Sequence, residues 1–153
     1  MTKRKKKTVY FAHSMEGMKI PEESGRRGRA ARELLGEDFE FFLAEDWQDR
    51  TDFTTIEKMD LDYLDRSDII LADLHNVGLK SKEGNVILCI GTNQEIGYAK
   101  KAGKYVVVIG RQPKNMHPFS VSKDMGGEFV DYYTTSLEDA CHHIIKKFRR
   151  RKC

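Results

Sequence analysis

The residues of this sequence best suited to chemistry are a few acidic side chains and a tyrosine that lie in or beside apolar runs. Glu95 belongs to the segment 91–110 (GTNQEIGYAKKAGKYVVVIG), which combines a glycine, a helix-start signal, a short amphipathic helix and an apolar run. Asp60 and Asp62 precede another apolar run, and Tyr10 lies inside the first one. Carboxylates without metal-ligand spacing suit work on carbon, because one can attack an anomeric centre while another group assists the leaving base.

Glu95 also has a purely structural interpretation. Residues 92–95 (TNQE) match the capping box S/T-x-x-E, in which two side chains satisfy free backbone N–H groups at a helix start. The pattern predicts a helix from Thr92 to about Ala102 with Gly103 just after it, so Glu95 would lie in the first turn. The helix N-terminus would then favour an ionised carboxylate, as a nucleophile needs. The direction of the Glu95 side chain therefore distinguishes a cap from a catalyst.

The elements that must position these residues alternate between apolar runs and helical patterns. Strands are predicted at 8–12, 39–44, 68–74, 105–109 and 129–133, and helices at 23–36, 52–66, 92–102 and 136–148. Ser136 and Asp139 make a capping signal for the last helix. This alternation is typical of βαβ units and predicts an α/β, flavodoxin-like or Rossmann-type three-layer sandwich with a mostly parallel five-stranded sheet. Ligands bind such sheets at the carboxyl ends of the strands.

The loops after the predicted strands contain further candidates for a substrate pocket. His13 and Ser14 follow the first strand, Trp47 follows the second, and Asp73 ends the third. Each also has a structural explanation: Asp73 could form an Asx turn, Trp47 could pack under a helix, and a lone loop histidine is more often structural.

Several function classes lose support because their motifs are missing. No GxxxxGK[ST] occurs and no GxGxxG follows the first strand, which argues against ATP hydrolysis and ordinary dinucleotide redox chemistry. A phosphoacceptor receiver domain would need an acidic pair where residues 12–14 read Ala-His-Ser. Cys89, Cys141 and Cys153 are far apart and form no CxxC pair, so neither a disulfide framework nor a zinc site is predicted. We expect no metal and no organic cofactor.

Composition predicts one soluble, cytoplasmic domain with basic ends and no contact with a membrane. No apolar run approaches the ~18 residues that a membrane span needs, and the first run is too short for a signal peptide. Eleven of the 27 basic residues lie within 3–7 and 146–152, and the other 16 against 24 acidic residues leave the body at −8. We expect basic tails at 1–7 and 149–153 around a domain at 8–148. Nucleic-acid binding beyond non-specific contact of these tails is not expected.

Three segments together resemble the nucleoside 2-deoxyribosyltransferase superfamily, which includes N-glycosidases of 2′-deoxynucleoside 5′-monophosphates. They read VYFAHSMEG, MDLDYLDRSDIILADL and GTNQEIGYAKKAGKYVVV, and the resemblance runs from about Thr8 to Ile109. The resemblance implies that Glu95 attacks C1′ of a 2-deoxyribosyl group and that Tyr10 orients the attacking carboxylate. It also implies that Asp60 contacts the sugar and assists proton transfer. The glycosyl-enzyme would pass its sugar to a second base or to water.

One position departs from the transferase pattern. The transferases usually place an aspartate six residues before the nucleophile, where it helps to hold and protonate the base, and this chain has Cys89 there. The nucleotide hydrolases often have a serine at that place and another in the loop after the first strand, which Ser14 could match. Both differences favour hydrolysis over base exchange. Lys80 and Lys82, in a loop longer than usual, could meet a phosphate or simply be solvated.

The resemblance leads to a set of predicted substrate contacts and leaves three functions open. The predicted contacts are His13, Ser14, Trp47, Asp73, Cys89, Gly91, Thr92 and Asn93. The leading function is N-glycosidic cleavage or transfer on a 2′-deoxynucleoside or its 5′-monophosphate, and an NAD glycohydrolase is the second. The third is a nucleotide-sensing domain without turnover, which Cys89 in place of aspartate invites. Relatives often complete the pocket from a neighbouring subunit, so a homo-oligomer is expected.

Overall fold

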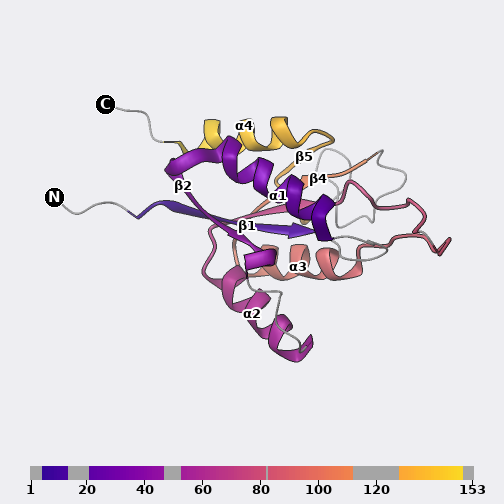
Figure 1. The fold of residues 1–153 in the computed structure, drawn as a ribbon. Coiled ribbons are helices and arrows are strands. Elements are labelled where there is room, and N and C mark those ends of the chain that lie inside the picture. The colour runs from indigo at the N-terminus through magenta and orange to yellow at the C-terminus, as the bar shows by residue number, and fades with distance from the viewer. Residues whose placement is uncertain (1–4, 14–20, 47–52, 82, 112–127, 150–153) are drawn as a thin grey trace.

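The computed structural model describes residues 5–13, 21–46, 53–81, 83–111 and 128–149, and a five-stranded sheet forms its centre. The strands are β1 (Lys7–His13), β2 (Phe39–Leu43), β3 (Ile69–Asp73), β4 (Tyr105–Ile109) and β5 (Tyr132–Thr134). They lie in the order β2-β1-β3-β4-β5, and every neighbouring pair is parallel. The predicted parallel α/β sandwich is therefore confirmed, as Figure 1 shows.

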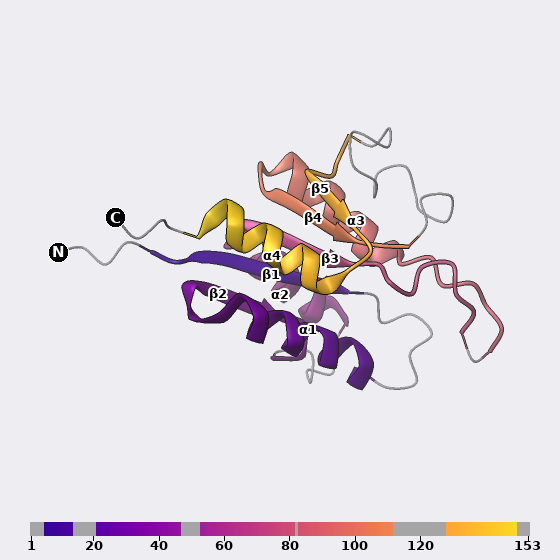
Figure 2. The same cartoon turned by 90° about the horizontal axis from the view of Figure 1, so that it is seen from above.

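Two pairs of helices cover the two faces of the sheet. The helices are α1 (Pro21–Leu35), α2 (Phe53–Asp65), α3 (Ile90–Lys101) and α4 (Leu137–Phe148), with short 3₁₀ turns η1 (Gly36–Asp38) and η2 (Ala44–Asp46). Helices α1 and α4 lie on one face and α2 and α3 on the other (Figure 1; Figure 2). No helix of the described residues is long and apolar enough to cross a membrane.

Strand alternation assigns each side chain to one of two cores. In β1, Val9 and Phe11 belong to the core under α1 and α4, whereas Tyr10 and Ala12 belong to the core under α2 and α3. The core under α1 and α4 is closely packed: a Cβ on Gly28 of α1 would collide with the Leu43 side chain of β2. The sheet thus separates two environments, and the residue's place in the strand decides which of them it enters.

Most predicted boundaries agree with the structure, and two need correction. Strand β4 has the predicted bounds, and Ser136 caps α4 by accepting the Asp139 N–H at 3.1 Å. Strand β5 begins at residue 132 rather than 129, because the Asp131 side chain, and not a strand carbonyl, accepts the Val106 N–H at 2.8 Å. Helix α3 begins at Ile90, two residues before the predicted start.

The early start of α3 removes the predicted capping box. The N-cap residue is Cys89, in the left-handed region with φ 54° and ψ 42°, and no side chain caps the helix there. Thr92 lies inside the helix, so its side chain is not at the capping position. Glu95 lies beyond the first turn, which contains no acidic residue. Gly103 does follow the helix as predicted, with φ 76°.

Candidate active site

Three elements bring Tyr10, Asp60 and Glu95 together on the α2 and α3 side of the sheet. Tyr10 comes from the middle of β1 and is 1% exposed, while Asp60 and Glu95 are half-buried on α2 and α3. The Tyr10 hydroxyl and the Glu95 carboxyl share a hydrogen bond, and the charge of Asp60 acts on both groups. The Glu95 side chain therefore points toward the predicted catalytic residues and not back along its own helix.

The environment of Glu95 favours its neutral form. Burial and the negative charge of Asp60 raise the pKa of the Glu95 carboxyl, the hydrogen bond with Tyr10 partly opposes both effects, and the net pKa is about 8. The expectation that a helix N-terminus would keep Glu95 ionised is therefore wrong. The helix begins earlier than predicted, and the dipole effect falls off within the first turn.

Tyr10 is a permanent hydrogen-bond donor in this cluster. Burial, and then the negative charges of Glu95 and Asp60, raise the pKa of the Tyr10 hydroxyl far above its ordinary value. The phenol consequently keeps its proton throughout the ordinary pH range. A buried neutral donor of this kind stabilises the ionised form of a neighbouring carboxylate and fixes the direction of its oxygen atoms.

The predicted contact residue Asp73 lies in a different environment. In β3, Ile69 and Leu71 face the α1 and α4 core, and Asp73 continues this alternation. Its carboxylate is fully buried and pairs with Arg27 of α1, with Nε–Oδ2 at 2.5 Å and Nη2–Oδ1 at 3.1 Å. His75 Nδ1 lies 3.0 Å from Asp73 Oδ1.

These partners determine the charge of Asp73. Burial alone would raise the pKa of the Asp73 carboxyl, but hydrogen bonds and positive charge from His75 and Arg27 outweigh burial and lower it. His13 is the register neighbour of Asp73 on β1, and its ring lies 5.8 Å from that of Phe11. The structure thus places His13 and Asp73 at the carboxyl end of the sheet, on the face opposite Glu95.

The N-terminus of α3 contains the other predicted contacts. The Cys89 thiol is buried and donates to Asn76 Oδ1, with sulfur and oxygen 3.4 Å apart. Asn93 Nδ2 donates to the carbonyls of Leu88 and Cys89 at 3.3 and 3.0 Å, so this amide fastens the helix start. Both residues therefore have structural partners in this state of the protein.

Gly91 and Thr92 differ from their neighbours in this segment. Gly91 is exposed, and a Cβ built there would have no described atom within 4 Å, which leaves open space beside the helix start. The Thr92 hydroxyl is buried, one turn before Glu95, and has no hydrogen-bond partner among the residues that the structure describes. An unsatisfied buried hydroxyl is costly, which makes this position a candidate ligand contact.

Sequence reasoning missed two residues and named two that cannot be placed. Arg27 gave no signal because it lies in an ordinary basic helix, 46 residues from the carboxylate that it binds. Asn76 could have been found, since it is a polar residue three positions after the end of the buried strand β3. Those two predicted contacts, Ser14 and Trp47, lie outside the described residues, as does Lys82, which could have met a phosphate.

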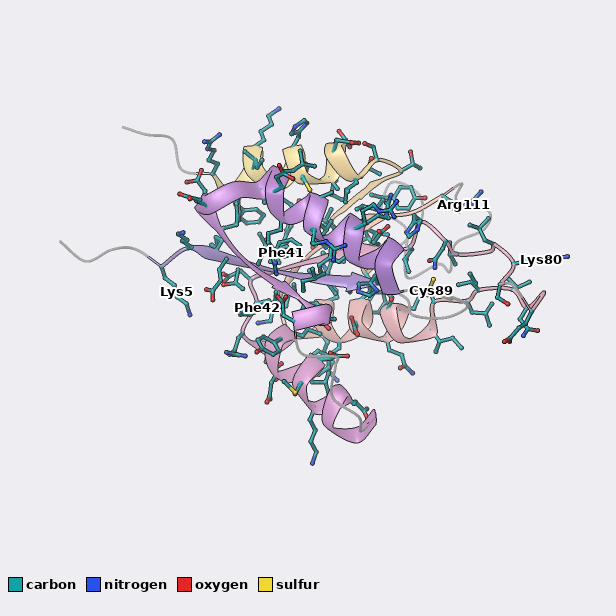
Figure 3. All side chains as sticks on the ribbon, viewed as in Figure 1. Lys5, Phe41, Phe42, Lys80, Cys89 and Arg111 are labelled. Carbon is teal, nitrogen blue, oxygen red and sulfur yellow. The ribbon has the colours of Figure 1, made fainter. Side chains whose placement is uncertain are left out.

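The surroundings of the cluster give no sign of a metal centre. Within the described ranges, no group of three or more His, Cys, Asp or Glu side chains is placed to hold a metal ion. Lys80 lies in an exposed hairpin, where residues 80 and 86 form an antiparallel bridge away from the sheet. Figure 3 shows this hairpin projecting from the body of the molecule.

Comparison with known proteins gives the fold a precedent. The sequence matches no protein-family model and no curated protein. The structure is similar to a 2-desoxiribosyltransferase from Leishmania mexicana, with a TM-score of 0.63 and 22% identity over 92% of this chain and 97% of the other. It is also similar to a 2-deoxyribosyltransferase from Bacillus psychrosaccharolyticus, with a TM-score of 0.62 and 17% identity over 92% of this chain and 95% of the other. A third similar structure is a CMP N-glycosidase from Clostridium botulinum, with a TM-score of 0.58 and 19% identity over 92% of this chain and 99% of the other.

These similarities confirm the predicted resemblance at the level of the fold. In each case nearly the whole of both chains is aligned, so the similarity covers the complete sheet and its helices. Identities of 17 to 22% do not by themselves transfer a substrate or a residue's role. Any assignment of chemistry must therefore come from the Tyr10, Asp60 and Glu95 cluster itself.

Proposed function

We propose that this protein cleaves or transfers the N-glycosidic bond of 2′-deoxynucleosides or their 5′-monophosphates. The observation that carries the proposal is the direction of Glu95, whose carboxyl is hydrogen-bonded with Tyr10 and lies within the field of Asp60. Similar structures include enzymes described as deoxyribosyltransferases and as a CMP N-glycosidase. The fold and the cluster point to the same class of reaction.

The reaction begins with a proton inside the acidic cluster. Because the pKa of Glu95 is about 8, its carboxyl holds a proton at neutral pH. Asp60 is the neighbouring acid whose charge acts on Glu95, and the proposed mechanism requires this proton to pass to Asp60 when substrate binds. Glu95 is then ionised beside a protonated Asp60, which is the arrangement that a nucleophile and a general acid require.

In the first step, a Glu95 carboxylate oxygen bonds to C1′ while the bond from C1′ to the base nitrogen breaks. The electron pair of that bond goes to the base, and the proton from Asp60 neutralises it. In the second step, water or an acceptor base attacks C1′, the ester to Glu95 breaks, and the proton of the attacking group returns to the acidic pair. Tyr10 supplies the hydrogen bond that fixes the orientation of the attacking Glu95 carboxylate.

The start of α3 favours hydrolysis over transfer. A transferase needs an acid beside the incoming and leaving bases, whereas this chain has the buried thiol of Cys89 bonded to the Asn76 amide. Neither group is an acid of suitable strength near neutral pH. We therefore propose water as the preferred acceptor, while Gly91, Thr92 and Asn93 remain predicted contacts of the substrate.

A direct assay tests the proposal. The protein is incubated with each deoxynucleoside and deoxynucleotide, with and without a free acceptor base, and base release is followed by chromatography. Release without acceptor supports hydrolysis, and product that needs acceptor means transfer. Glu95→Gln should abolish release, whereas the matched control Glu33→Gln, on the exposed side of α1, should not.

Two outcomes would replace the proposal by another function. Cleavage of NAD alone would make the protein an NAD glycohydrolase. Absence of any release, together with a higher melting temperature in the presence of nucleotides, would support a nucleotide-sensing domain. Full activity of the Glu95→Gln variant would overturn the mechanism while leaving the reaction class intact.

A further inference from the structure

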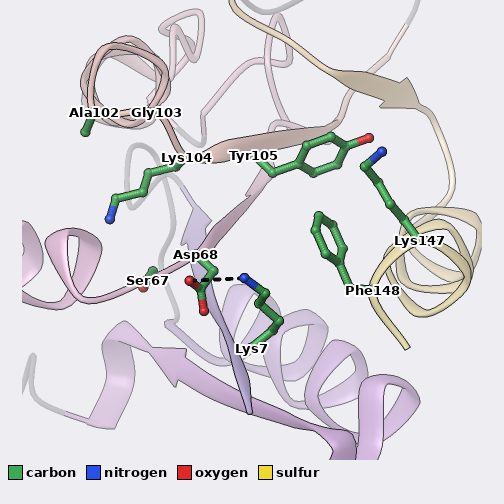
Figure 4. Close-up of a pocket in the computed structure, with 9 residues that line it drawn as sticks. All are labelled: Lys7, Ser67, Asp68, Ala102, Gly103, Lys104, Tyr105, Lys147 and Phe148. Carbon is green, nitrogen blue, oxygen red and sulfur yellow. Dashed lines mark ion pairs between the residues drawn. The ribbon is translucent and has the colours of Figure 1, made fainter. Parts of the chain in front are cut away.

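A cavity lies at the end of the sheet opposite the strand ends that usually bind substrate. It measures about 330 Å³ and opens where β1 and β4 begin and α4 ends (Figure 4). Its main side chains are Lys7, Asp68, Lys104, Tyr105, Lys147 and Phe148. We call these residues the basic edge. Ligands of folds of this class bind at the carboxyl ends of the strands, so this cavity is separate from the expected substrate site.

Two lysines of the basic edge keep an uncompensated charge. Lys7 is paired with Asp68, with Nζ and Oδ1 3.7 Å apart, so these charges largely cancel. Lys104 Nζ donates to the Asp65 carbonyl at 2.7 Å, a contact that leaves its charge intact. Within the described part of the chain, no carboxylate pairs with Lys104 or Lys147. Both ammonium groups are therefore available to an anion.

Aromatic rings lie between these charges. Tyr105 and Phe148 meet edge to face, with their centroids 5.1 Å apart at 76°. Lys147 Nζ lies 5.0 Å from the centre of the Tyr105 ring, and both rings are only half-buried. A flat aromatic ligand could stack in this cavity while its anionic substituents reach the lysines.

The fold concentrates further positive charge beside this cavity. Exposed Lys5 and Lys6 stand at the N-terminal end of the described chain. At its C-terminal end, the last turn of α4 contains Lys146 and Lys147. The start of β1 and the end of α4 lie on the same side of the molecule (Figure 2) and line the same cavity. Two basic segments that are far apart in sequence thus become one positive region on a body of net charge −8.

We propose that the basic edge binds single-stranded nucleic acid. Lys104 and Lys147 contact phosphates, and an unpaired base stacks on the ring of Phe148, which Tyr105 meets edge to face. This combination of a positive groove and aromatic faces is the usual means of binding single strands without sequence preference. The proposal is independent of the glycosidic chemistry at Glu95.

The shape of the cavity favours a single strand over other anionic partners. A cavity of about 330 Å³ can take a base, whereas the stacked bases of a duplex cannot reach recessed rings. Ala102 is the one aliphatic side chain among the lining residues and Phe148 the one wholly apolar ring, so the cavity offers little apolar surface to insert into a lipid bilayer.

Binding of a fluorescent oligothymidylate to the full chain, followed by anisotropy, tests the proposal. The double variant Lys104→Gln/Lys147→Gln should bind about tenfold more weakly at low salt. Its dependence of log K on log salt should be shallower by about 1.4, because two phosphate contacts are lost. The matched control Lys58→Gln/Lys80→Gln removes the same charge from exposed sites elsewhere and should bind like the wild type.

The aromatic contact has its own test. Phe148→Leu keeps an apolar side chain in place but removes the ring, and should weaken oligothymidylate binding by about five- to hundredfold. The same variant should bind an abasic oligomer of equal length as the wild type does. Melting temperatures of all variants show whether each protein is folded.

Several results would overturn the proposal. One is an equal loss of affinity in the two double-lysine variants, which would mean that only net charge matters. Others are equal binding of the abasic oligomer and oligothymidylate by the wild type, or tighter binding of duplex than of single strand. Binding to anionic phosphatidylserine vesicles without binding to oligothymidylate would identify a membrane surface instead.

Discussion

The molecule has two buried acidic centres, one on each face of the same sheet, and their chemistry is opposite. On the α1 side, Asp73 has the Arg27 guanidinium and the His75 ring as partners, and these lower the pKa of its carboxyl against the effect of burial. On the α2 and α3 side, Glu95 has a phenol and a second acid as partners, and its pKa rises to about 8. Burial acts on both carboxyls in the same direction, so the partners decide the difference.

This difference separates a structural carboxylate from a reactive one. The charge of Asp73 is satisfied by Arg27, with the His75 ring nearby, and the ion pair with Arg27 joins α1 to the end of β3. Glu95 has a phenol and a negative charge as its partners in place of a cation. Its carboxyl therefore ionises with difficulty near neutral pH. Perturbed acids of the second kind are typical of functional sites.

Replacing Glu95 should have the largest effect on activity. Glu95→Gln removes the proposed nucleophile and should lower kcat/KM by at least about 10³-fold. Steady-state measurement of base release provides the test. An equally inactive Glu33→Gln control would show that the loss is not specific to this site.

The same variant should be more stable than the wild type at high pH. The folded-state pKa of Glu95 lies above its ordinary value, so its contribution to stability is present at low pH and lost as pH rises through about 8. Gln mimics the neutral carboxyl, and at pH 9 it should raise the free energy of unfolding by roughly 1–3 kcal/mol. Urea denaturation at pH 5 and pH 9 measures this, and a smaller gain at pH 9 than at pH 5 would contradict it.

Breaking the other acidic centre should affect stability. Arg27→Met leaves the buried Asp73 carboxylate without its bidentate partner and should cost about 3–5 kcal/mol in the free energy of unfolding. Urea denaturation at neutral pH measures the loss. Because the raised Asp73 pKa would then favour protonation, the loss should shrink on acidification; a pH-independent loss would mean that packing alone is involved.

Removing the phenol should have a smaller effect on catalysis. Tyr10→Phe deletes one hydrogen bond to a charged group and should lower kcat/KM by about 10–100-fold. The pKa of Glu95 should rise above about 8, because the deleted hydrogen bond opposes that rise. Because the proposed reaction needs the one proton of the acidic pair, the falling limb of the pH profile of kcat/KM should therefore move to higher pH. A fall in activity without any shift would mean that Tyr10 only shapes the pocket.

Removing the second acid should shift the pH dependence in the other direction. Asp60→Asn takes away a negative charge, so the pKa of Glu95 should fall from about 8 by roughly one unit. Carboxyl ¹³C chemical shifts of labelled Glu95 measure this without reference to activity. An unchanged or higher pKa would show that burial alone sets the value.

The sequence predicted which residues form the acidic cluster, but it did not predict where the helix that carries Glu95 begins. The motifs containing Tyr10, Asp60 and Glu95 led to a shared site, and the three residues do meet. The predicted helix start at Thr92 was wrong because Cys89 takes up a left-handed conformation that lets the helix begin at Ile90. A single backbone conformation of this kind leaves no pattern in the sequence.

Contacts between distant elements were the part that could not be predicted. The pairing of Arg27 with Asp73 joins residues 46 positions apart and needs the register of α1 on the sheet. The basic edge likewise forms only when β1, β4 and α4 end at one place. The distribution of lysine and arginine predicted the basic ends of the chain, but it did not predict the cavity between them.

The sequence by itself determined the parallel α/β architecture, since the alternation of buried strands and amphipathic helices has few other solutions. It also determined which residue types are available for chemistry. The tertiary structure alone decided which face of the sheet each acid enters and which partners it meets. Those partners set the charge of each buried group, because in a medium of low polarity the nearest charges and hydrogen bonds outweigh the intrinsic acidity of the side chain.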